Sequence, residues 1–557
     1  MSRQPASPAV LVLALLTGLV TLVSQSGTID VQVLAINDLH GTLQAPAGGA
    51  GRIGSTEVGG IEYLATHLAR LRAGHPYTIT VSAGDNIGAS PFMSGLFHDE
   101  PTIETLNAAG LELSAVGNHE LDEGWSELAR MQNGGCHPRD GCQDGTPFDG
   151  AAFRFLAANI EVDPARATPP QPFAPSAVRE FDGVKIGFIG LTLHSAPDIV
   201  PAPGIAGLSF ADEARAGNVA AAALRRQGVR AIVVLIHEGG RTASETTDVC
   251  QSMSGALPDI VRRFSPDIDV VVSGHSHRAY VCTLGRTLVT SAEAFGRLIT
   301  DIDLRLDRRT GRVVAKSASN VPVTRDVSRD ERVASILRHY AAFVDKEAAR
   351  VVGSIVGPIS RNRNAAGESP LGDVVADGML WASNDSRKGG AAFALMNPGG
   401  IRTDLVRGAG SGEPTGGPVT YADLYRVLPF GNQLLVKTLS GDAIRRLLEQ
   451  QFDNPTPGSD TILQVSANFT YTYHRSRPAG RRVDPGSMRL NGAPIDSRKR
   501  YRVVMPDFVW SGGDRFTAAM EGTDVAPAIT DIDALGSYVQ SHSPIPSGPA
   551  DRIRREP

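Results

Sequence analysis

The 557-residue chain has few cysteines, few aromatic residues and no excess of basic charge, and each shortage removes a class of protein. Four cysteines without any Cys-x2-Cys spacing exclude a disulfide mini-scaffold and disfavour a zinc site built from cysteine alone. The net charge of -5 gives no electrostatic footprint for a nucleic-acid polymer. Hydrophobic residues make up 41% and charged residues 20%, which excludes a disordered chain and leaves enough sequence for several domains.

Long apolar runs are missing except at the N-terminus. Residues 9–23 carry no charge, follow Arg3 and precede a polar stretch at 24–27. This run is short for a membrane-spanning helix but suits the core of a signal peptide. We therefore predict a signal peptide over residues 1–26 and a periplasmic or extracellular protein without stable membrane insertion. An uncleaved N-terminal anchor is the alternative.

Export would place the four cysteines in an oxidising compartment, where disulfides persist. Cys136 and Cys142 flank a short loop that contains glycine, and Cys250 and Cys282 remain as a second pair. We predict one disulfide from each pair. Free buried thiols are the alternative.

The chain contains two regions of mixed helix and strand character. From Asp30 onward, short β-rich apolar runs alternate with amphipathic stretches, as in a sheet layered with helices. Over Val333–Val352 apolar residues recur at three- and four-residue steps, which predicts a connecting helix. We predict an N-terminal domain over 27–330, a linker helix over 331–352 and a second α/β domain over 353–557.

Five strand-like runs of the first region end in Asp, Asn or His, usually beside glycine. In open α/β sheets, ligands bind outside the carboxyl ends of the strands, so these five ends are expected to converge. One such group alone is more typical of a turn, because Gly, Asn and Asp favour turns. The side chains at the five ends are Asp38 and His40, Asp85, Asn118 and His119, His237, and His275 and His277.

The chemical types of these side chains indicate metal binding. A mixture of imidazole nitrogen and carboxylate oxygen suits zinc, manganese, iron or cobalt, whereas oxygen-only sets suit calcium or magnesium. Asp38 and His40 are two residues apart, as are His275 and His277, so each pair faces one side of an extended segment. The set is large enough for two divalent ions that share one carboxylate.

The order Asp-x-His, Gly-Asp, Gly-Asn-His-Glu, His and Gly-His-x-His resembles that of the calcineurin-like metallophosphoesterases. The segments 37–41 and 117–122 are similar to the 5'-nucleotidase branch of that family. Segments 397–402, 428–432 and 508–514 resemble the C-terminal nucleotide-binding motifs of the same branch. The resemblance covers nearly the whole mature chain. It implies an α/β protein with a four-layer αββα sandwich and a second α/β nucleotide-binding domain.

The resemblance also implies a role for each predicted metal ligand. One ion would be held by Asp38, His40 and His277, and the other by Asn118, His237 and His275, with Asp85 bridging the two. His277 stands where some family members have Gln or Asn, which leaves the identity of the metal open among zinc, manganese and cobalt.

His119 and Asp122 match the catalytic dyad of the family. Their spacing supports this assignment, because side chains three residues apart meet at the start of a helix. The carboxylate would then orient the imidazole.

The second domain would bind the nucleotide. Phe430 and Phe508 would stack on the base, which is worth about 1–3 kcal/mol per base. Arg402 suits a phosphate clamp, Asn432 the base edge and Asp514 a ribose hydroxyl. A further arginine is expected before residue 368, and Arg361 is favoured over Arg363. The full substrate-binding set predicted by the resemblance is Arg361, Asn397, Gly400, Arg402, Phe430, Asn432, Phe508 and Asp514.

These motifs predict a secreted two-metal hydrolase that removes the 5'-phosphate from nucleotides. The same site would serve a 2',3'-cyclic nucleotide 2'-phosphodiesterase or a UDP-sugar or dinucleotide pyrophosphatase, and the sequence does not separate these. A hydrolase of sulfur compounds on the same fold is a more distant alternative. A non-catalytic nucleotide-binding module predicts gaps in the ligand set or the dyad, and the sequence has none. The partner expected is a small nucleotide, and the oligomeric state stays open.

Overall fold

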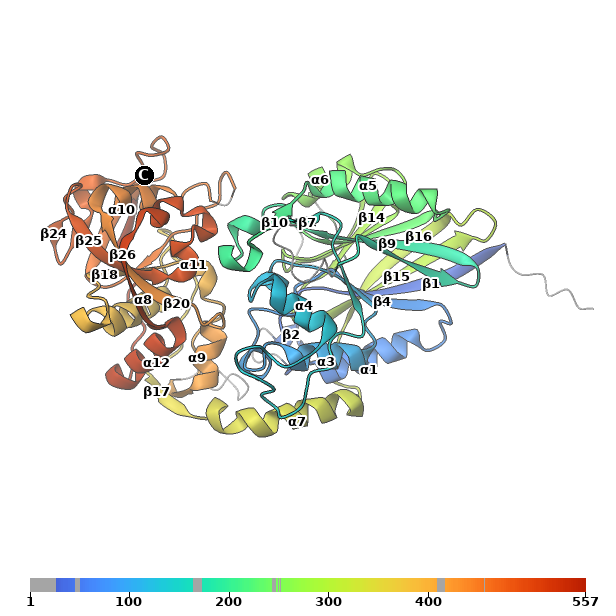
Figure 1. Cartoon of the computed structure of the whole chain (residues 1–557), viewed down its shortest axis with the longest axis horizontal. Coiled ribbons are helices and arrows are strands. Elements are labelled where there is room, and N and C mark those ends of the chain that lie inside the picture. Colours follow the sequence, from blue (N-terminus) through green and yellow to red (C-terminus); the bar gives the residue numbers. More distant parts are fainter. Residues whose placement is uncertain are drawn as a thin grey trace, which may run out of the picture.

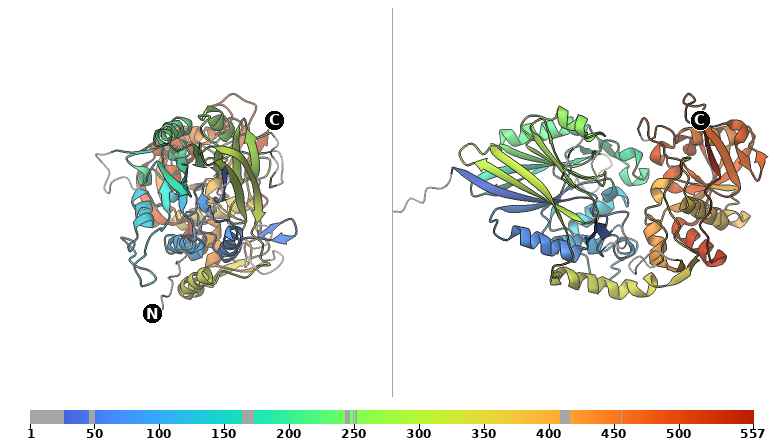
Figure 2. Two further views of the ribbon diagram at one scale, coloured as in Figure 1. Left: turned by 90° about the vertical axis from the view of Figure 1, so that its right-hand side faces the viewer. Right: turned by 180° about the vertical axis from the view of Figure 1, so that it is seen from behind.

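A computed structural model of the chain describes residues 27–45, 51–163, 173–242, 247–248, 250, 252–407, 416–454 and 456–557. The predicted signal peptide lies outside these residues. Figures 1 and 2 show two lobes connected by the long helix α7 (Glu331–Ala348). In the described part of the chain, none of the helices has the length and apolar character needed to cross a membrane.

The N-terminal lobe contains two six-stranded sheets that pack face to face. The strands of the first sheet, in spatial order, are β16 (Val313–Pro322), β15 (Leu298–Asp307), β1 (Thr28–Ile36), β4 (Thr78–Ser82), β5 (Leu113–Ala115) and β6 (Arg154–Leu156). Those of the second are β13 (Ala279–Leu284), β14 (Thr287–Ala292), β12 (Val270–Ser273), β11 (Ala231–His237), β9 (Val184–Thr192) and β8 (Ser176–Phe181).

Strand β1 shows why the central strands read as continuous apolar runs. Its residues Ile29, Val31 and Val33 point into the core between the two sheets. Leu34 and Ile36 point the other way, into the layer between the first sheet and its helices. Because successive side chains of a strand alternate between faces, a strand buried on both faces must be apolar throughout.

Helices cover the outer face of each sheet. On the first sheet, α1 (Ile61–Arg72) and α3 (Glu100–Ala109) contribute to the apolar core. On the second, α5 (Glu213–Arg226) and α6 (Leu257–Arg263) do the same. The predicted four-layer arrangement, helix, sheet, sheet and helix, is therefore confirmed (Figure 1).

The C-terminal lobe is a second α/β domain, as predicted. Its five-stranded sheet has the order β21 (Gln464–Val465), β18 (Phe393–Met396), β25 (Arg500–Pro506), β20 (Gln433–Ser440) and β26 (Thr523–Thr530). Helices α8 (Pro370–Ser383) and α12 (Asp531–His542) pack on one face, and α10 (Gly441–Glu449) with strand β22 (Phe469–His474) packs on the other.

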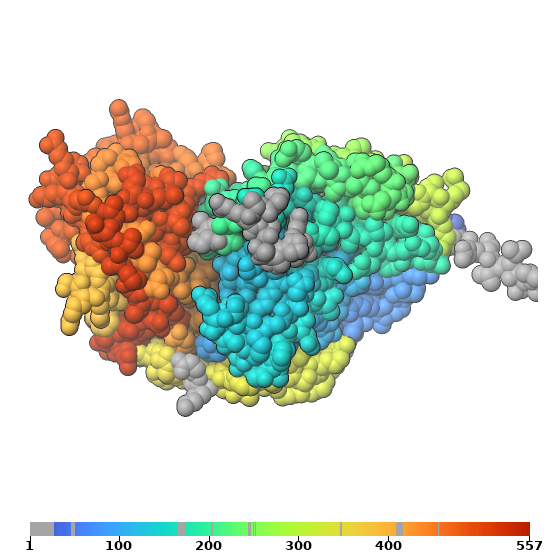
Figure 3. Space-filling model, viewed as in Figure 1, coloured from blue at the N-terminus to red at the C-terminus, as the bar shows by residue number. Residues whose placement is uncertain are grey.

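Helix α7 runs along the N-terminal lobe and leads into the second domain. Tyr340 and Val344 are buried against the first lobe. The helix ends at Ala348, and Val351 begins strand β17 (Val351–Ile355), which pairs with β19 (Gly417–Thr420). The predicted boundary at residue 330 falls at the start of α7, and that at 353 falls within β17. Figure 3 shows the two lobes in contact on one side, with α7 below them.

Both predicted disulfides are present. One joins Cys136 to Cys142 and the other joins Cys250 to Cys282. The first closes a short loop, and the second links strand β13 to the segment that follows β11.

Candidate active site

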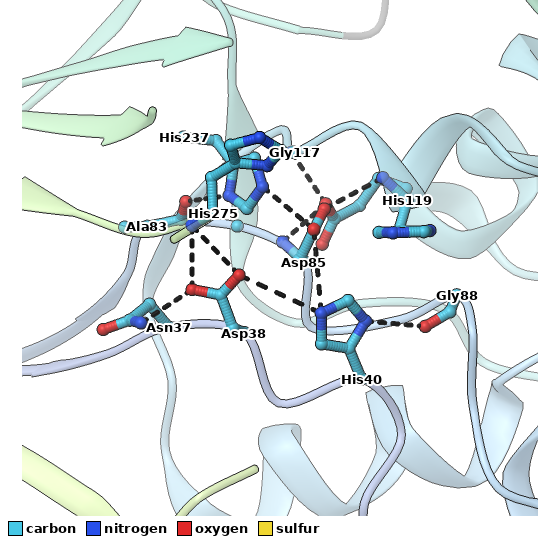
Figure 4. A network of polar contacts seen from close by, with 12 residues as sticks. Asn37, Asp38, His40, Ala83, Asp85, Gly88, Gly117, His119, His237 and His275 are labelled. Atoms are coloured by element: carbon cyan, nitrogen blue, oxygen red, sulfur yellow. Dashed lines mark hydrogen bonds and ion pairs between the residues drawn. The ribbon is translucent and has the colours of Figure 1, made fainter. Parts of the chain in front are cut away.

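The parallel strands deliver the predicted metal ligands to one place. Strands β1, β4 and β5 are parallel in one sheet, and β9, β11 and β12 are parallel in the other. The two sheets face each other, with β5 against β9 and β11, so their carboxyl ends meet. Figure 4 shows the side chains of Asp38, His40, Asp85, His237 and His275 converging on this point.

The first predicted ligand set is Asp38, His40 and His277, whose ligand atoms lie within 4.8 Å of one another. His277 Nε2 lies 3.3 Å from Asp38 Oδ1 and 3.1 Å from His40 Nε2. His40 Nδ1 is 2.9 Å from the Gly88 carbonyl oxygen. When Nδ1 donates a hydrogen bond to this carbonyl oxygen, the lone pair of Nε2 is directed at Asp38 and His277. A metal-binding imidazole requires this arrangement.

The second set is Asp85, His237 and His275, which also lies within 4.8 Å. His237 Nε2 is 2.9 Å from Asp85 Oδ2, while its Nδ1 is 2.9 Å from the carbonyl oxygen of Ala83. Asn118, the remaining predicted ligand, has a buried Oδ1 without a hydrogen-bond partner. A buried amide oxygen left unpaired costs free energy, so the residues present fit a cation at this position.

Asp85 occupies the position expected of a bridging group. Its Oδ2 lies 2.9 Å from His237 Nε2 in one set and 3.8 Å from His40 Nε2 in the other. The side chain is only 2% exposed. Among the described residues grouped by ligand distance, Asp85 belongs to one group with His237 and His275 and to another with His40 and His119.

The backbone at the site is strained. Asp38, His40, Asp85, His275 and His277 all have positive φ, at 51°, 48°, 51°, 66° and 51°. Non-glycine residues in this region cost of the order of 1–3 kcal/mol each and persist where the surrounding structure enforces them. Five of the seven predicted ligands therefore share a conformation that the fold maintains at a cost in stability.

Burial controls the ionisation of the histidines. It lowers the pKa of His275 to about 4, with the neighbouring His237 adding to the effect. It also lowers the pKa of His40 well below the ordinary value. These two rings are therefore neutral near pH 7, which is the form that binds metals. At His237 burial acts in the same direction, but the Asp85 carboxylate outweighs it and raises the pKa to about 10.

The predicted dyad forms beside the ligands. His119 and Asp122 bracket the short helix η2 (His119–Leu121), and His119 Nδ1 lies 2.7 Å from Asp122 Oδ2. Burial alone lowers the pKa of His119, but the carboxylates of Asp122 and Asp85 raise it above the ordinary value. The two carboxylates therefore favour the protonated form of the ring next to the ligand cluster.

The sequence interpretation left Glu120 without a role, although it lies between the two dyad residues. Its carboxylate is buried and accepts hydrogen bonds from the backbone N–H groups of Asp85, Asn86 and Gly117 at 2.7–2.8 Å. It thereby ties the loop that carries Asp85 to the loop that precedes His119. The sequence did contain a sign of this role, because Glu120 follows Gly117 by three residues and lies between His119 and Asp122.

A cleft of about 530 Å³ lies between the lobes and brings the dyad together with the second domain. Its lining includes His119, Asp122, Asn118 and His275 from the first domain. The predicted substrate-binding residues that line it are Asn397, Gly400, Arg402, Phe430, Asn432, Phe508 and Asp514. Arg361 and Arg363 do not line the cleft.

The arginine alternatives differ in their surroundings. Arg361 donates from Nη1 to the Ile401 carbonyl at 2.9 Å, next to Arg402. Burial, and then the charge of Arg361, lower the pKa of Arg402. Arg363 instead points to the Asp460 carbonyl at 3.3 Å. Of the two, Arg361 is the one beside Arg402, which lines the cleft.

Phe430 lies closer to the dyad than expected for a residue that only contacts a base. Its ring stacks on His119 with centroids 5.7 Å apart and planes at 19°. The Arg402 guanidinium lies 5.6 Å from the centre of the same ring. Phe508 packs against Gly513, where a Cβ atom would lie 2.5 Å from the ring, so a larger residue at 513 would displace the ring.

Two buried carboxyl groups support the polar residues of the second domain. Asn397 Nδ2 donates to Asp514 Oδ2 at 3.0 Å, and burial raises the pKa of Asp514 to about 6. Asn432 Nδ2 donates to Asp531 Oδ2 at 2.9 Å, and burial raises the pKa of Asp531 to about 7. The role of Asp531 was not predicted, because it lies about a hundred residues from its partner in sequence.

Two family models together match most of the chain. The family model of calcineurin-like phosphoesterase matches residues 31–279, and that of the 5'-nucleotidase C-terminal domain matches residues 351–521. Endonuclease YhcR of Bacillus subtilis is 31% identical over 523 residues, which cover 92% of this chain but 40% of that protein.

A second relative and a solved structure are similar over more of their own length. Cell wall protein Lmo0130 of Listeria monocytogenes is 31% identical over 541 residues, covering 92% of this chain and 67% of that protein. The crystal structure of a 5'-nucleotidase precursor from Thermus thermophilus has a TM-score of 0.75 and 26% sequence identity. It covers 95% of this chain and 100% of its own.

Proposed function

Because the chain belongs to the 5'-nucleotidase family of calcineurin-like metallophosphoesterases, and is thus a metal-dependent phosphoester hydrolase, we propose that it hydrolyses nucleoside 5'-phosphates to nucleoside and phosphate. The observation that carries the proposal is the shared cleft. One cavity is lined by the dyad, by candidate metal ligands and by the nucleotide-binding motifs of the second domain.

Two divalent ions fit the donor groups present. Asp38, His40 and His277 would hold one, Asn118, His237 and His275 the other, and Asp85 would contact both. When bound, such ions supply Lewis acidity toward a phosphoryl oxygen and make water a better nucleophile near neutral pH. Zinc, manganese and cobalt all suit this mixture of nitrogen and oxygen donors.

His119 would act on the reacting phosphate as an acid. Asp122 accepts from its Nδ1, which leaves Nε2 as the nitrogen available to substrate. Water adds to phosphorus as the ester P–O bond breaks, and the departing 5'-oxygen needs a proton. An imidazolium in the cleft can donate that proton or a hydrogen bond to a phosphoryl oxygen. Asp122 holds the ring in place and stabilises its charge.

The second domain would select nucleotides over simple phosphate esters. Arg402 would bind an anionic phosphate oxygen, and its position beside the dyad and Phe430 supports this role. Phe508 offers an apolar face for a base. Asp514 and Asn432 supply polar groups for the ribose and the base edge.

We further propose that the protein is exported. The N-terminal apolar segment has the composition of a signal peptide, both cysteine pairs form disulfides, and one relative is named as a cell wall protein. Processing at a site near residue 26 is checked by N-terminal sequencing of the protein recovered from the cell exterior.

The substrate assay compares four compounds with and without a chelator, using the purified protein. AMP represents nucleoside monophosphates, UDP-glucose represents sugar nucleotides, and cyclic AMP and 2',3'-cyclic AMP represent phosphodiesters. The proposal expects the highest kcat/KM for AMP and loss of turnover with chelator. Preference for UDP-glucose or for a cyclic nucleotide would assign the same site to the pyrophosphatase or phosphodiesterase alternative. The name of the Bacillus relative, an endonuclease, makes the phosphodiester arm worth including.

A further inference from the structure

A second group of histidine and carboxylate side chains lies at the rim of the same cleft. We call these four residues, His98, Glu123, Glu127 and His137, the rim cluster. Each offers one ligand atom, and the four atoms lie within 4.8 Å of one another. None of them belongs to the ligand sets or the dyad described above.

The rim cluster joins three segments of the first domain. His98 follows helix α2 (Phe92–Gly95), and Glu123 lies between η2 and α4 (Trp125–Asn133). Glu127 is in the first turn of α4. His137 lies in the loop closed by the Cys136–Cys142 disulfide. A ligand bound by all four would connect the disulfide loop to the segment that carries the dyad.

Asp140 orients both imidazoles of the cluster. Its Oδ2 lies 2.9 Å from His98 Nε2 and 3.2 Å from His137 Nδ1. His98 Nε2 can donate to this carboxylate, which leaves His98 Nδ1 with its lone pair. His137 Nδ1 accepts from the Asp140 backbone N–H at 3.1 Å, so binding an ion through His137 Nε2 requires this contact to be exchanged for donation from Nδ1 to Asp140 Oδ2. His98 Nδ1 then faces Glu123 Oε2 at 2.7 Å, and His137 Nε2 faces Glu127 Oε2 at 4.0 Å. Carboxylates that receive the second N–H of a histidine are typical of metal sites.

The charges around the two rings favour a cation. Three carboxylates, those of Glu123, Glu127 and Asp140, surround the pair. The cation that pairs with Glu127 is Arg130, and it is shared with Glu100. The cluster therefore has more negative than positive charge when the imidazoles are neutral.

Protonation of the two rings adds little positive charge to balance these carboxylates. The rings of His98 and His137 are stacked with centroids 3.7 Å apart, so two imidazolium ions would repel each other. Burial opposes protonation of His98, but its carboxylate partner Glu123 outweighs this and raises the pKa. Burial and the charge of His98 lower the pKa of His137. One proton is accommodated at the pair, and a divalent ion would bring twice that charge.

We propose that the rim cluster binds a divalent transition-metal ion, with zinc the best fit, separately from the two-metal centre. Two imidazole nitrogens and two carboxylate oxygens are a donor set that zinc binds tetrahedrally, at about 2.0–2.2 Å. Neighbouring donors are then about 3.4 Å apart, between the 2.7 Å and 4.0 Å observed. Binding needs the two ring planes, now 17° apart, to open and face one point.

This ion would sit beside the reaction without taking part in it. Glu123 directly follows Asp122 in the chain, and His98, Glu123 and Glu127 line the same cleft as the dyad. An ion held there would fix the disulfide loop against the wall of the cleft. It would also neutralise carboxylates that otherwise repel an anionic substrate.

The test measures metal content of the full-length protein after dialysis against buffered micromolar free Zn²⁺. The proposal expects three equivalents in the wild type and two in His98→Gln, His137→Gln and Glu123→Gln. Asp140→Asn should weaken the third equivalent about 10- to 100-fold without removing a ligand. His474→Gln is a matched control, because that histidine lies 3.6 Å from Glu556 at a distant surface and should keep all three.

Two results would overturn the proposal. One is a wild-type protein with no more than two equivalents, in which case the cluster holds a proton shared by stacked imidazoles. The other is retention of the third equivalent in both Glu123→Gln and His98→Gln. Circular dichroism checks that each variant is folded. If a histidine variant fails to fold, the metal content of Glu123→Gln provides the test. The side chain of Glu123 is 42% exposed, so its replacement leaves the packing intact.

Discussion

The carboxylate of Asp85 lies within 4 Å of an imidazole from each ligand set, at 2.9 Å from His237 and 3.8 Å from His40. Replacing it with alanine removes the only group placed to contact both ions in the proposed arrangement. We expect Asp85→Ala to lose bound metal and to lower turnover of AMP at least about 100-fold, since both ions act on the reacting phosphate. Metal analysis and steady-state kinetics check this. More than a few per cent of activity in metal-free Asp85→Ala would contradict the two-metal proposal.

Glu120 offers a residue-scale prediction about stability. Its carboxylate accepts backbone hydrogen bonds from Asp85, Asn86 and Gly117, and alanine would leave three buried N–H groups without a partner. Each such group costs about 1–3 kcal/mol, so Glu120→Ala should lower the free energy of unfolding by about 3 kcal/mol or more.

Glu120→Gln is the matched control for that measurement. Its carbonyl oxygen can replace Oε2, which accepts from Asp85 and Gly117, but its amide group cannot replace Oε1. Urea unfolding should therefore show a loss for glutamine well below that for alanine. Equal losses would mean that the packing of the side chain, and not its hydrogen bonds, holds the loops together.

At this scale the sequence predicted which residues meet but not how. The spacing of Asp38 and His40, and of His275 and His277, was enough to place them at strand ends. Their left-handed backbone was not predictable, because only the packed structure enforces a conformation that Asp and His adopt rarely. The rim cluster was missed for a similar reason. His98 and His137 each looked like a lone surface histidine until the disulfide loop brought them together.

At the scale of elements, the strands were easier to predict than their partners. Buried parallel strands such as β11 must be apolar on both faces, so the sequence marks them clearly. The end of the linker helix was harder. Apolar spacing continues through Val351 and Val352, but β-branched residues suit a strand, and β19 provides the pairing partner. Tertiary pairing therefore ends the helix earlier than periodicity implies.

Helix α12 carries a prediction about pH. Asp531 at its first turn is buried, accepts a hydrogen bond from Asn432 and has its pKa raised by burial to about 7. An unfolded aspartate titrates near pH 4, so the folded state binds this proton more tightly. The stability contribution of this group is therefore fully present below about pH 4 and is lost as the pH rises toward about 7.

Asp531→Asn should remove that loss. At about 1.4 kcal/mol for each pKa unit, wild type should lose up to about 4 kcal/mol relative to the variant between pH 4 and pH 7. Denaturant unfolding at several pH values measures the difference. Parallel pH profiles for the two proteins would show that the Asp531 carboxylate is not held in its neutral form.

On the scale of the whole molecule, the two lobes meet across the cleft through a few specific contacts. Arg515 of the second domain pairs with Asp198 of the first, with Nη2 to Oδ2 at 2.6 Å. Phe430 of the second domain stacks on His119 of the first. The ion pair is partly exposed and is worth at most about 1 kcal/mol. The lobes also meet through Phe92 of the first domain, whose ring packs on Tyr421 and Tyr425 of the second. In the function proposed above, the first domain would act on the reacting phosphate and the second domain would bind the nucleoside.

That division predicts opposite kinetic effects for two variants. Phe508 is assigned to the base, so Phe508→Ala should lower kcat/KM for AMP about 10- to 100-fold, equivalent to a stacking loss of about 1–3 kcal/mol. It should hardly change kcat/KM for p-nitrophenyl phosphate, which has no base.

His119→Asn should instead lower kcat for both substrates, because the interaction of His119 with the substrate strengthens in the transition state. Phe430 lies against His119, so Phe430→Ala should fall between the two and impair both substrates. Equal damage to both substrates by Phe508→Ala would place the base elsewhere in the cleft and leave Phe508 a structural residue packed against Gly513.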